Sequence, residues 1–301
     1  MNMKVDLCGV TLNNPVMTAS GTFGSGAEYA EFVDLNKLGA VVTKGVANVP
    51  WPGNPTPRVA EVYGGMLNAV GLQNPGIDLF IQRDIPFLKK YDTKIMVNVC
   101  GHSTEEYIEV VERLRDQPVD LLEINISCPN VKEGGIAFGQ DPKAVEAITK
   151  EMKKHAAQPV IMKLSPNVTD ITEMARAAEA GGADGLSLIN TITGMKIDIH
   201  RQKFVLANKT GGMSGPAIHP VAVRMVYQTA QAVKLPIVGM GGIMNAEDAI
   251  EMILAGATAV SVGTANFTNP HVTEQIVDGI KAYMERYQVQ NIKDLVGAVH
   301  E

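Results

Sequence analysis

The sequence lacks the features that would place the chain in a membrane or on a nucleic acid. No apolar run reaches the roughly 18 residues that a membrane-spanning helix requires. Basic residues form no cluster, and 32 acidic against 26 basic side chains leave a net charge of -6, which argues against nucleic acid as the main partner. Lys4 and Asp6 occupy positions where a signal peptide would need its apolar segment. We therefore expect a cytoplasmic protein.

Cysteine is also scarce. The three cysteines, Cys8, Cys100 and Cys128, lie far apart in the sequence, which is typical of reduced thiols and not of a disulfide framework. No CxxC or HxxxH spacing suggests a metal or an iron–sulfur cluster in this chain. No GxGxxG motif follows the first apolar run at 15–20, which disfavours a dinucleotide-binding Rossmann domain.

What the sequence does contain is an alternation of short apolar runs and amphipathic stretches. Eight runs have the composition of buried strands, at 15–20, 39–44, 94–99, 121–126, 160–165, 185–190, 236–241 and 258–263. Helical periodicity is clearest at 76–90, 104–115, 141–156, 169–180, 219–234, 245–255 and 272–287, with a weaker helix candidate at 28–38. Asp141, before a first-turn proline, and Asn245 supply helix start signals.

Strands that are apolar on both faces and alternate with helices predict a parallel sheet. Eight such units predict an α/β fold of the (β/α)₈ TIM-barrel type, formed by residues 1–301 as a single domain; a doubly wound sheet is the alternative. The segment 3–12 predicts a short hairpin that plugs the bottom of the barrel. The connections 46–75 and 192–217 are long, and long ordered loops over the active face of a barrel are usually functional.

The predicted strands end in polar or glycine residues, although the strands themselves are apolar. In a barrel these carboxyl ends form the active face, so side chains from eight strands would surround one pocket. The residues at or just after these ends are Ser20, Gly21, Thr43, Lys44, Gly45, Asn98, Asn125, Cys128, Lys163, Asn190, Thr191, Gly241, Gly242, Gly263 and Thr264.

The last two strand ends have the pattern of a phosphate site. GMGGI (239–243) and SVGTA (261–265) each offer bare backbone N–H groups before a predicted helix. Close packing of glycine between strand and helix would explain one such motif. The pair on adjacent strands favours a phosphate group, from a phosphorylated substrate or from a cofactor such as FMN.

Two lysines, Lys44 and Lys163, stand inside apolar strands. Burying an ammonium group is costly, so buried lysines are rare without a partner. A structural ion pair or a head group that reaches solvent would explain them. We favour a functional interpretation, in which fixed positive charges stabilise an anion that forms during a reaction.

Cys128 lies in the stretch NISCPNVKEGGIAFG (125–139), between a strand end and a glycine-rich loop. Most cysteines are small buried hydrophobes, an interpretation that suits Cys8 and Cys100. A thiol at a strand end before proline could instead be a nucleophile or a general base. His102 is the one histidine just past a neighbouring strand end, and it is equally compatible with a surface position.

Several longer motifs together resemble the dihydroorotate dehydrogenase family, and within it the class 1B, NAD-linked catalytic subunits. The similarity extends from about residue 4 to 290. The motifs are GNPTPRVAEVYGGMLNAVGLQNPG (53–76), NISCPNVKEGGIAFGQDP (125–142), VTKG (42–45), INT (189–191) and the VGMGGI/VGTA pair.

This resemblance implies an FMN enzyme of pyrimidine biosynthesis that oxidises (S)-dihydroorotate to orotate. Substrate C6 gives a hydride to flavin N5, and Cys128 is the base that takes the proton from C5. The residues implied around FMN are Ser20, Lys44, Gly45, Asn98, Asn125, Lys163, Ile189, Gly215, Gly241, Gly242, Gly263 and Thr264. Those implied around the substrate are Lys44, Asn68, Ala69, Val70, Gly71, Leu72, Asn125, Asn130, Asn190 and Thr191.

The resemblance also implies a homodimer within a heterotetramer, in which a second subunit carries FAD and a [2Fe–2S] cluster and passes electrons to NAD⁺. The alternative is a fumarate-linked class 1A enzyme, which shares the cysteine loop. Membrane-linked class 2 enzymes use a serine base and an N-terminal extension, so Cys128 and the short start disfavour them.

Two further functions compete with this one. A tRNA dihydrouridine synthase is another FMN barrel with a loop cysteine, but it would need a basic face, which a net charge of -6 disfavours. The second is a non-catalytic scaffold barrel, which would not need to keep its lysines, asparagines and Cys128.

The motif NVCGH (98–102) departs from the family pattern by placing Cys100 and His102 beside Asn98.

Overall fold

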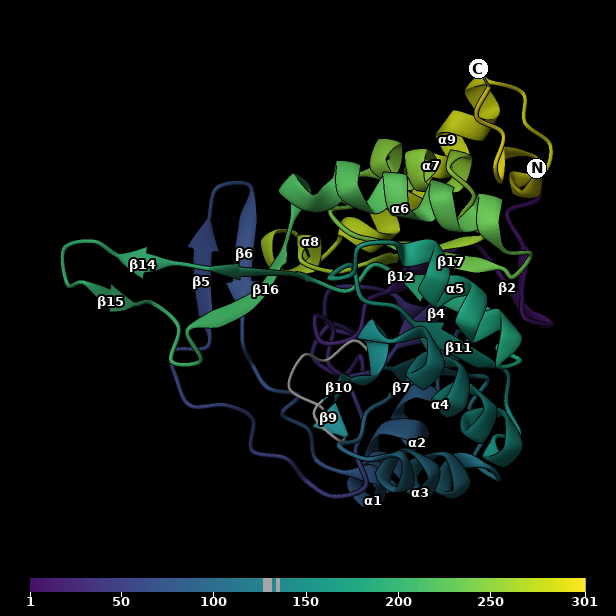
Figure 1. The fold of residues 1–301 in the computed structure, drawn as a ribbon. Coiled ribbons are helices and arrows are strands. Elements are labelled where there is room, and N and C mark those ends of the chain that lie inside the picture. Colours follow the sequence, from purple (N-terminus) through teal and green to yellow (C-terminus); the bar gives the residue numbers. More distant parts are fainter. Residues whose placement is uncertain (127–131, 134–135, 301) are drawn as a thin grey trace.

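The computed structural model describes residues 1–126, 132–133 and 136–300. At its centre, eight parallel strands close into a barrel surrounded by helices (Figure 1). This confirms the predicted (β/α)₈ architecture, and each predicted apolar run contributes one barrel strand. In barrel order the strands are β3 (Val16–Thr18), β4 (Ala40–Val42), β7 (Lys94–Val99), β8 (Leu121–Asn125), β11 (Val160–Lys163), β12 (Gly185–Leu188), β17 (Ile237–Met240) and β18 (Ala259–Val262).

Helices follow the strands close to the predicted positions. The main ones are α3 (Thr104–Leu114), α4 (Pro142–His155), α5 (Ile171–Ala180), α6 (His219–Ala232), α7 (Ala246–Leu254) and α9 (Val272–Arg286). The predicted helix at 76–90 is α1 (Ile77–Leu79), a π-helical turn η2 (Phe80–Asp84) and α2 (Ile85–Leu88). Asp141 and Asn245 cap α4 and α7 as predicted, because their side chains accept hydrogen bonds from the first-turn backbone.

The weaker helix candidate at 28–38 is wrong. The segment holds isolated helical turns, such as the hydrogen bond from Ala30 N to Gly26 O, and a 3-10 turn η1 (Leu35–Lys37). The Asp34 backbone is extended and its side chain accepts from a backbone N–H of η1. Aspartate competes with the helix by this kind of local bond, and so ends the turns before they join.

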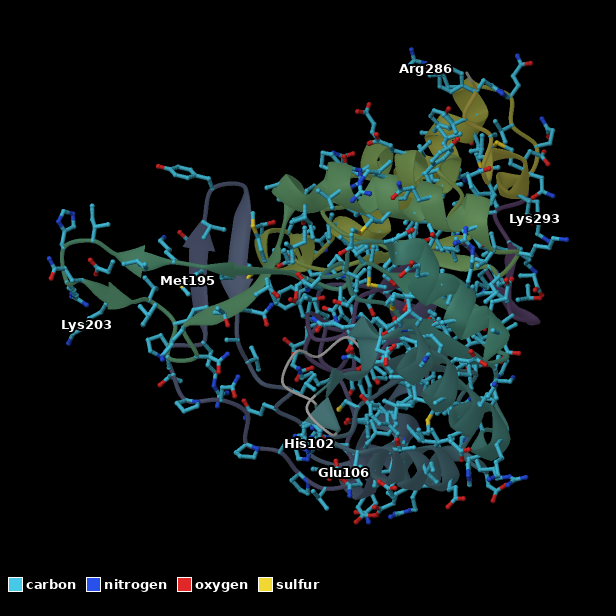
Figure 2. All side chains as sticks on the ribbon, in the orientation of Figure 1. His102, Glu106, Met195, Lys203, Arg286 and Lys293 are labelled. Atoms are coloured by element: carbon cyan, nitrogen blue, oxygen red, sulfur yellow. The ribbon has the colours of Figure 1, made fainter. Side chains whose placement is uncertain are left out.

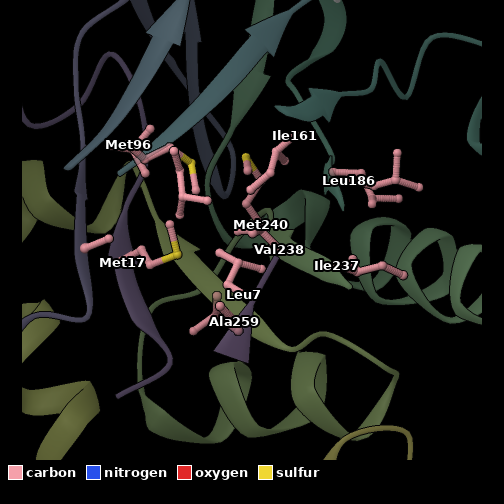
Figure 3. Packing of buried hydrophobic residues seen from close by; sticks show 14 of the residues in the cluster. Leu7, Met17, Met96, Ile161, Leu186, Ile237, Val238, Met240 and Ala259 are labelled. Atoms are coloured by element: carbon pink, nitrogen blue, oxygen red, sulfur yellow. The ribbon is translucent and has the colours of Figure 1, made fainter. Parts of the chain in front are cut away.

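The predicted amino-terminal hairpin is present as β1 (Val5–Leu7) and β2 (Val10–Leu12). Leu7 is fully buried and packs in the core near Val238 and Ala259 (Figure 3). The turn of the hairpin lies against the first residue of β12, since a Cβ built on Gly185 would be 2.7 Å from Cys8 Sγ. The hairpin therefore covers the amino-terminal end of the barrel, opposite the candidate site.

The two long connections form a sheet of their own, which sequence periodicity did not indicate. The antiparallel strands β13 (Ile192–Met195), β16 (Thr210–Ser214), β6 (Gly65–Asn68) and β5 (Val59–Val62) pair in that order. A small hairpin of β14 (Ile197–Asp198) and β15 (Lys203–Phe204) projects beyond them, away from both termini (Figure 1). Lys203 lies in this hairpin and Met195 at the end of β13, whereas Arg286 and Lys293 lie on the side of the molecule that holds both termini (Figure 2).

The remaining elements are short. They are β9 (Lys132–Glu133), β10 (Ile136–Ala137), η3 (Phe138–Gln140), η4 (Pro216–Ile218), α8 (Ala265–Thr268) and η5 (Ile292–Leu295). Within the part of the chain that the structure describes, no helix is both long enough and apolar enough to span a membrane.

Candidate active site

A cavity opens at the carboxyl ends of the barrel strands and extends beneath the antiparallel sheet. Its wall combines strand ends with residues of the two long connections, which is the expected place for a barrel active site. Most residues predicted around FMN are part of this wall: Ser20, Lys44, Asn125, Lys163, Ile189, Gly215, Gly241, Gly242, Gly263 and Thr264. Gly45 and Asn98 are not part of it, and Asn98 is fully buried behind the wall.

The residues predicted around the substrate also gather here. Asn68, Ala69, Val70, Gly71, Leu72, Asn190 and Thr191 line the same cavity, together with the shared residues Lys44 and Asn125. Cys128 and Asn130 lie outside the described residues. The predicted base and one predicted substrate residue therefore stay predictions.

The glycines of the two motifs differ in how closely they are packed. A Cβ on Gly241 would lie 2.6 Å from Ala222, and one on Gly242 would lie 2.7 Å from His219, so close packing alone requires glycine there. Among the described residues, a Cβ at Gly263 would meet nothing nearer than Ala19 at 3.5 Å. Neither packing nor a positive φ explains Gly263, whose missing side chain instead keeps the cavity open. This opening fits the bound phosphate group that the motif predicts.

His219 supports the first glycine motif from behind. Its Nδ1 lies 2.8 Å from the Gly241 carbonyl oxygen, and its Nε2 lies 3.2 Å from Glu251 Oε2. The ring therefore joins the loop after β17 to helix α7. Sequence reasoning missed this residue, and a histidine at the start of a helix gave no signal for it.

Lys163 both forms a buried ion pair and lines the cavity. Its side chain is 6% exposed and lines the cavity, and its Nζ lies 3.4 Å from Glu123 Oε2. Glu123 Oε2 also accepts a hydrogen bond of 2.6 Å from Asn98 Nδ2. Sequence reasoning missed Glu123, although a carboxylate inside the apolar run LLEINI is the same kind of signal that identified the two lysines.

Arg58 holds the loop that the predictions assign to the substrate. Its guanidinium donates to the carbonyl oxygens of Asn54 (2.5 Å) and Pro52 (3.0 Å) and to Gln73 Oε1 (2.6 Å). Asn54 in turn donates from Nδ2 to the Ala69 carbonyl at 3.0 Å. These bonds connect Asn54 and Arg58 of the motif GNPTPR to Ala69 and Gln73.

Amide side chains cluster at the ends of β8 and β12. Asn190 Nδ2 donates to Asn125 Oδ1 at 3.4 Å, and Asn190 Oδ1 accepts from Thr191 N at 2.7 Å. Asn167 Nδ2 donates to the Thr191 carbonyl at 3.1 Å. Amides present both donors and acceptors, so this edge of the cavity suits a planar ligand with amide groups.

Cys100 and His102 lie outside the cavity wall. Cys100 is fully buried behind Gly45, where a Cβ would approach its sulfur to 3.3 Å. His102 packs its ring on Trp51 at 3.9 Å between centroids, and its Nδ1 lies 3.2 Å from Glu106 Oε2 (Figure 2). His102 therefore anchors a long connection to helix α3. Among the described residues, no group of three or more His, Cys, Asp or Glu could hold a metal ion.

Comparison with known proteins agrees with this geometry. The family model described as dihydroorotate dehydrogenase matches residues 2–284. Three similar proteins are each named dihydroorotate dehydrogenase B (NAD(+)), catalytic subunit. The one from Lachnoclostridium phytofermentans is 70% identical over 99% of this chain and 100% of its own length. The one from Alkaliphilus metalliredigens is 65% identical over 99% of this chain and 99% of its own length. The one from Geotalea uraniireducens is 55% identical over 99% of this chain and 98% of its own length. This chain belongs to the dihydroorotate dehydrogenase family.

Proposed function

We propose that this chain is the catalytic subunit of an NAD-linked dihydroorotate dehydrogenase, which oxidises (S)-dihydroorotate to orotate in pyrimidine biosynthesis. The observation that carries the proposal is 70% identity, over essentially the whole chain, to a protein named for that activity. The cavity supports it, because it gathers cationic, amide and glycine residues at the carboxyl face of a barrel.

FMN is the cofactor that these residues fit. Gly241, Gly242, Gly263 and Thr264 would hold its phosphate, and the open space at Gly263 is the structural observation in favour of that placement. When bound, FMN supplies the acceptor for the hydride that leaves C6 of the substrate. Lys163 would place a positive charge beside the flavin and stabilise the negative charge that arrives with the electrons.

Dihydroorotate is a ring with amide edges and one carboxylate. Asn125, Asn190 and Asn68 would match donors and acceptors on the ring. Lys44 and the backbone of residues 69–72 would hold the carboxylate, and Asn130 would complete the set. Such fixed contacts orient C6 and C5 for reaction and exclude other geometries.

Cys128 is the residue that would take the proton from C5. This role rests on the sequence motif at 125–142. An ordinary thiol has a pKa of about 8.5 and is mostly protonated at neutral pH. A cysteine base therefore predicts a rate that rises with pH until the thiolate is fully formed.

Electron transfer to NAD⁺ would require a second subunit, since the similar proteins are named as catalytic subunits of an NAD(+) enzyme. We propose that the partner carries FAD and a [2Fe–2S] cluster and that two copies of this chain form the centre of a heterotetramer. A class 1A enzyme that reduces fumarate is the second candidate, because it shares the cysteine loop.

The test measures dihydroorotate oxidation by the purified chain with fumarate or NAD⁺, with and without the partner. NAD⁺ reduction that depends on the partner supports the proposal. Efficient fumarate reduction by the chain alone would favour class 1A. Flavin fluorescence that responds to tRNA and not to dihydroorotate would favour a tRNA dihydrouridine synthase.

A further inference from the structure

We infer that Glu123 is a positioning residue, which holds the Lys163 side chain directed into the cavity. The inference rests on the proposed FMN site and extends it to a residue behind the wall. Glu123 is 1% exposed and is not part of the cavity wall, whereas Lys163 is. Glu123 would therefore act on the cofactor through Lys163 and not by contact.

Strand register places two polar side chains, from the strands on either side, at the carboxylate of Glu123. Asn98 on β7 is the register partner of Glu123 on β8, and Ile161 is its partner on β11. Lys163 is two residues beyond Ile161, so it lies on the same side of β11 and one step nearer to the cavity. Glu123 Oε2 receives both polar contacts, from Asn98 Nδ2 at 2.6 Å and from Lys163 Nζ at 3.4 Å.

Among the described residues, the surroundings of Lys163 offer few other polar contacts. The neighbouring core is apolar and includes Met96 and Ile161 (Figure 3). A buried charged group is stabilised by a partner of opposite charge, and Glu123 is that partner for Lys163. An ammonium has three N–H donors, so Lys163 can contact Glu123 and still donate into the cavity.

Asn98 has a supporting role in the same cluster. Its Nδ2 holds the carboxylate, while its Oδ1 and Glu123 Oε1 have no hydrogen-bond partner among the described residues. The carboxylate is therefore held by Asn98 from strand β7 and by Lys163 from strand β11, on the side nearer to the cavity. This arrangement explains how Asn98 can matter to FMN binding although it lies outside the cavity wall.

The test is Glu123→Gln, which keeps the shape and an acceptor for Asn98 but removes the negative charge. We expect the Lys163 side chain to lose its fixed position beside the flavin in this variant, because its ion pair with Glu123 is removed. The flavin midpoint potential should then fall, and the FMN dissociation constant should rise about tenfold, as expected for a lost charged contact. Both quantities are measured on purified protein, by reductive titration against a reference dye and by fluorescence titration of the apoprotein.

Two further variants separate positioning from simple packing. Glu123→Asp keeps the charge at a greater distance from Lys163, so its changes should have the same sign and be smaller. Asp84→Asn makes the same chemical change at another buried carboxylate, which contacts Ser25 and Arg83 and does not line the cavity. It should leave the potential and the FMN affinity at wild-type values.

A wild-type potential and FMN affinity in Glu123→Gln would overturn the inference, as would an equal or larger change in Glu123→Asp. If Glu123→Gln does not fold, Glu123→Asp alone decides: a lower potential supports the inference and a wild-type potential overturns it. Failure of the wild-type chain to bind FMN would instead overturn the proposed function, so the two failures are distinguishable.

Discussion

The hydroxyl of Thr264 donates a hydrogen bond of 2.7 Å to Ser214 Oγ. Thr264 follows barrel strand β18, and Ser214 ends strand β16 of the antiparallel sheet. Both residues line the cavity. This bond therefore fixes the position of the sheet relative to the barrel at the predicted phosphate site.

Ser214→Ala tests that connection. Without this bond the cavity wall at the predicted phosphate site is held less firmly, so we expect the FMN dissociation constant to rise roughly three- to tenfold, a loss of about 1 kcal/mol. The measurement is fluorescence titration of FMN into the apoprotein. Ser103→Ala is the matched control, since Ser103 caps helix α3 away from the cavity and should affect only thermal stability. Unchanged FMN affinity in Ser214→Ala would contradict the role of this bond.

Gly263→Val tests whether the phosphate sits where the cavity is open. A Cβ at Gly263 meets Ala19 at 3.5 Å, an ordinary contact, so the apoprotein should fold. The added side chain would occupy the cavity, and we expect at least a tenfold weaker FMN affinity, about 1.4 kcal/mol. Gly241→Val is the contrasting variant, because a clash with Ala222 at 2.6 Å should reduce folding itself. A wild-type FMN dissociation constant in Gly263→Val would rule out this position.

Cys128→Ala tests the proposed base. The variant should bind FMN and keep its yellow colour, while turnover falls roughly 10²- to 10⁴-fold, the usual contribution of a general base. Cys8→Ala is the control, since Cys8 lies at the end of the barrel away from the cavity and should not affect turnover. Wild-type turnover in Cys128→Ala would disprove the assignment.

The alkaline stability of the chain should depend on Cys8. The pKa of this thiol is raised from 9.0 to about 12, mainly by burial and further by the charges of Asp184 and Asp6, while Lys153 opposes the shift. The folded state thus favours the protonated thiol. Its contribution to stability is complete below pH 9.0 and is lost as the pH rises toward 12.

Cys8→Ala should therefore lose less stability than the wild type between pH 8 and about pH 10.5, measured by urea unfolding. Tyr63→Phe is the control, since it removes a phenol that is fully exposed in the folded chain. Equal losses in Cys8→Ala and the wild type would show that the Cys8 thiol does not contribute.

The barrel could be predicted from the sequence because its strands are short, apolar on both faces and separated by helical periodicity. The position of the cavity could be predicted from the barrel, since parallel strands bring residues as distant as Lys44 and Gly263 to one edge. The antiparallel sheet could not be predicted. Its strands, such as Gly65–Asn68 and Thr210–Ser214, are rich in glycine and polar residues and pair across a long sequence separation.

The sequence also did not identify the functional candidates that lie behind the cavity wall. Glu123 and His219 act through contacts with residues that lie far away in sequence, at Lys163 and Gly241. A pattern of strand ends cannot identify such contacts. The charge of Glu123 inside an apolar strand was nevertheless a usable signal, because a buried carboxylate requires a nearby cation.

Anaerobic mixing of the purified, FMN-loaded chain with dihydroorotate tests the central claim most directly. We expect the visible flavin absorbance to bleach and orotate to form in equal amount, without any partner subunit. Bleaching by dithionite but not by dihydroorotate would show that the chain binds a reducible flavin yet does not oxidise this substrate, and would contradict the proposed function.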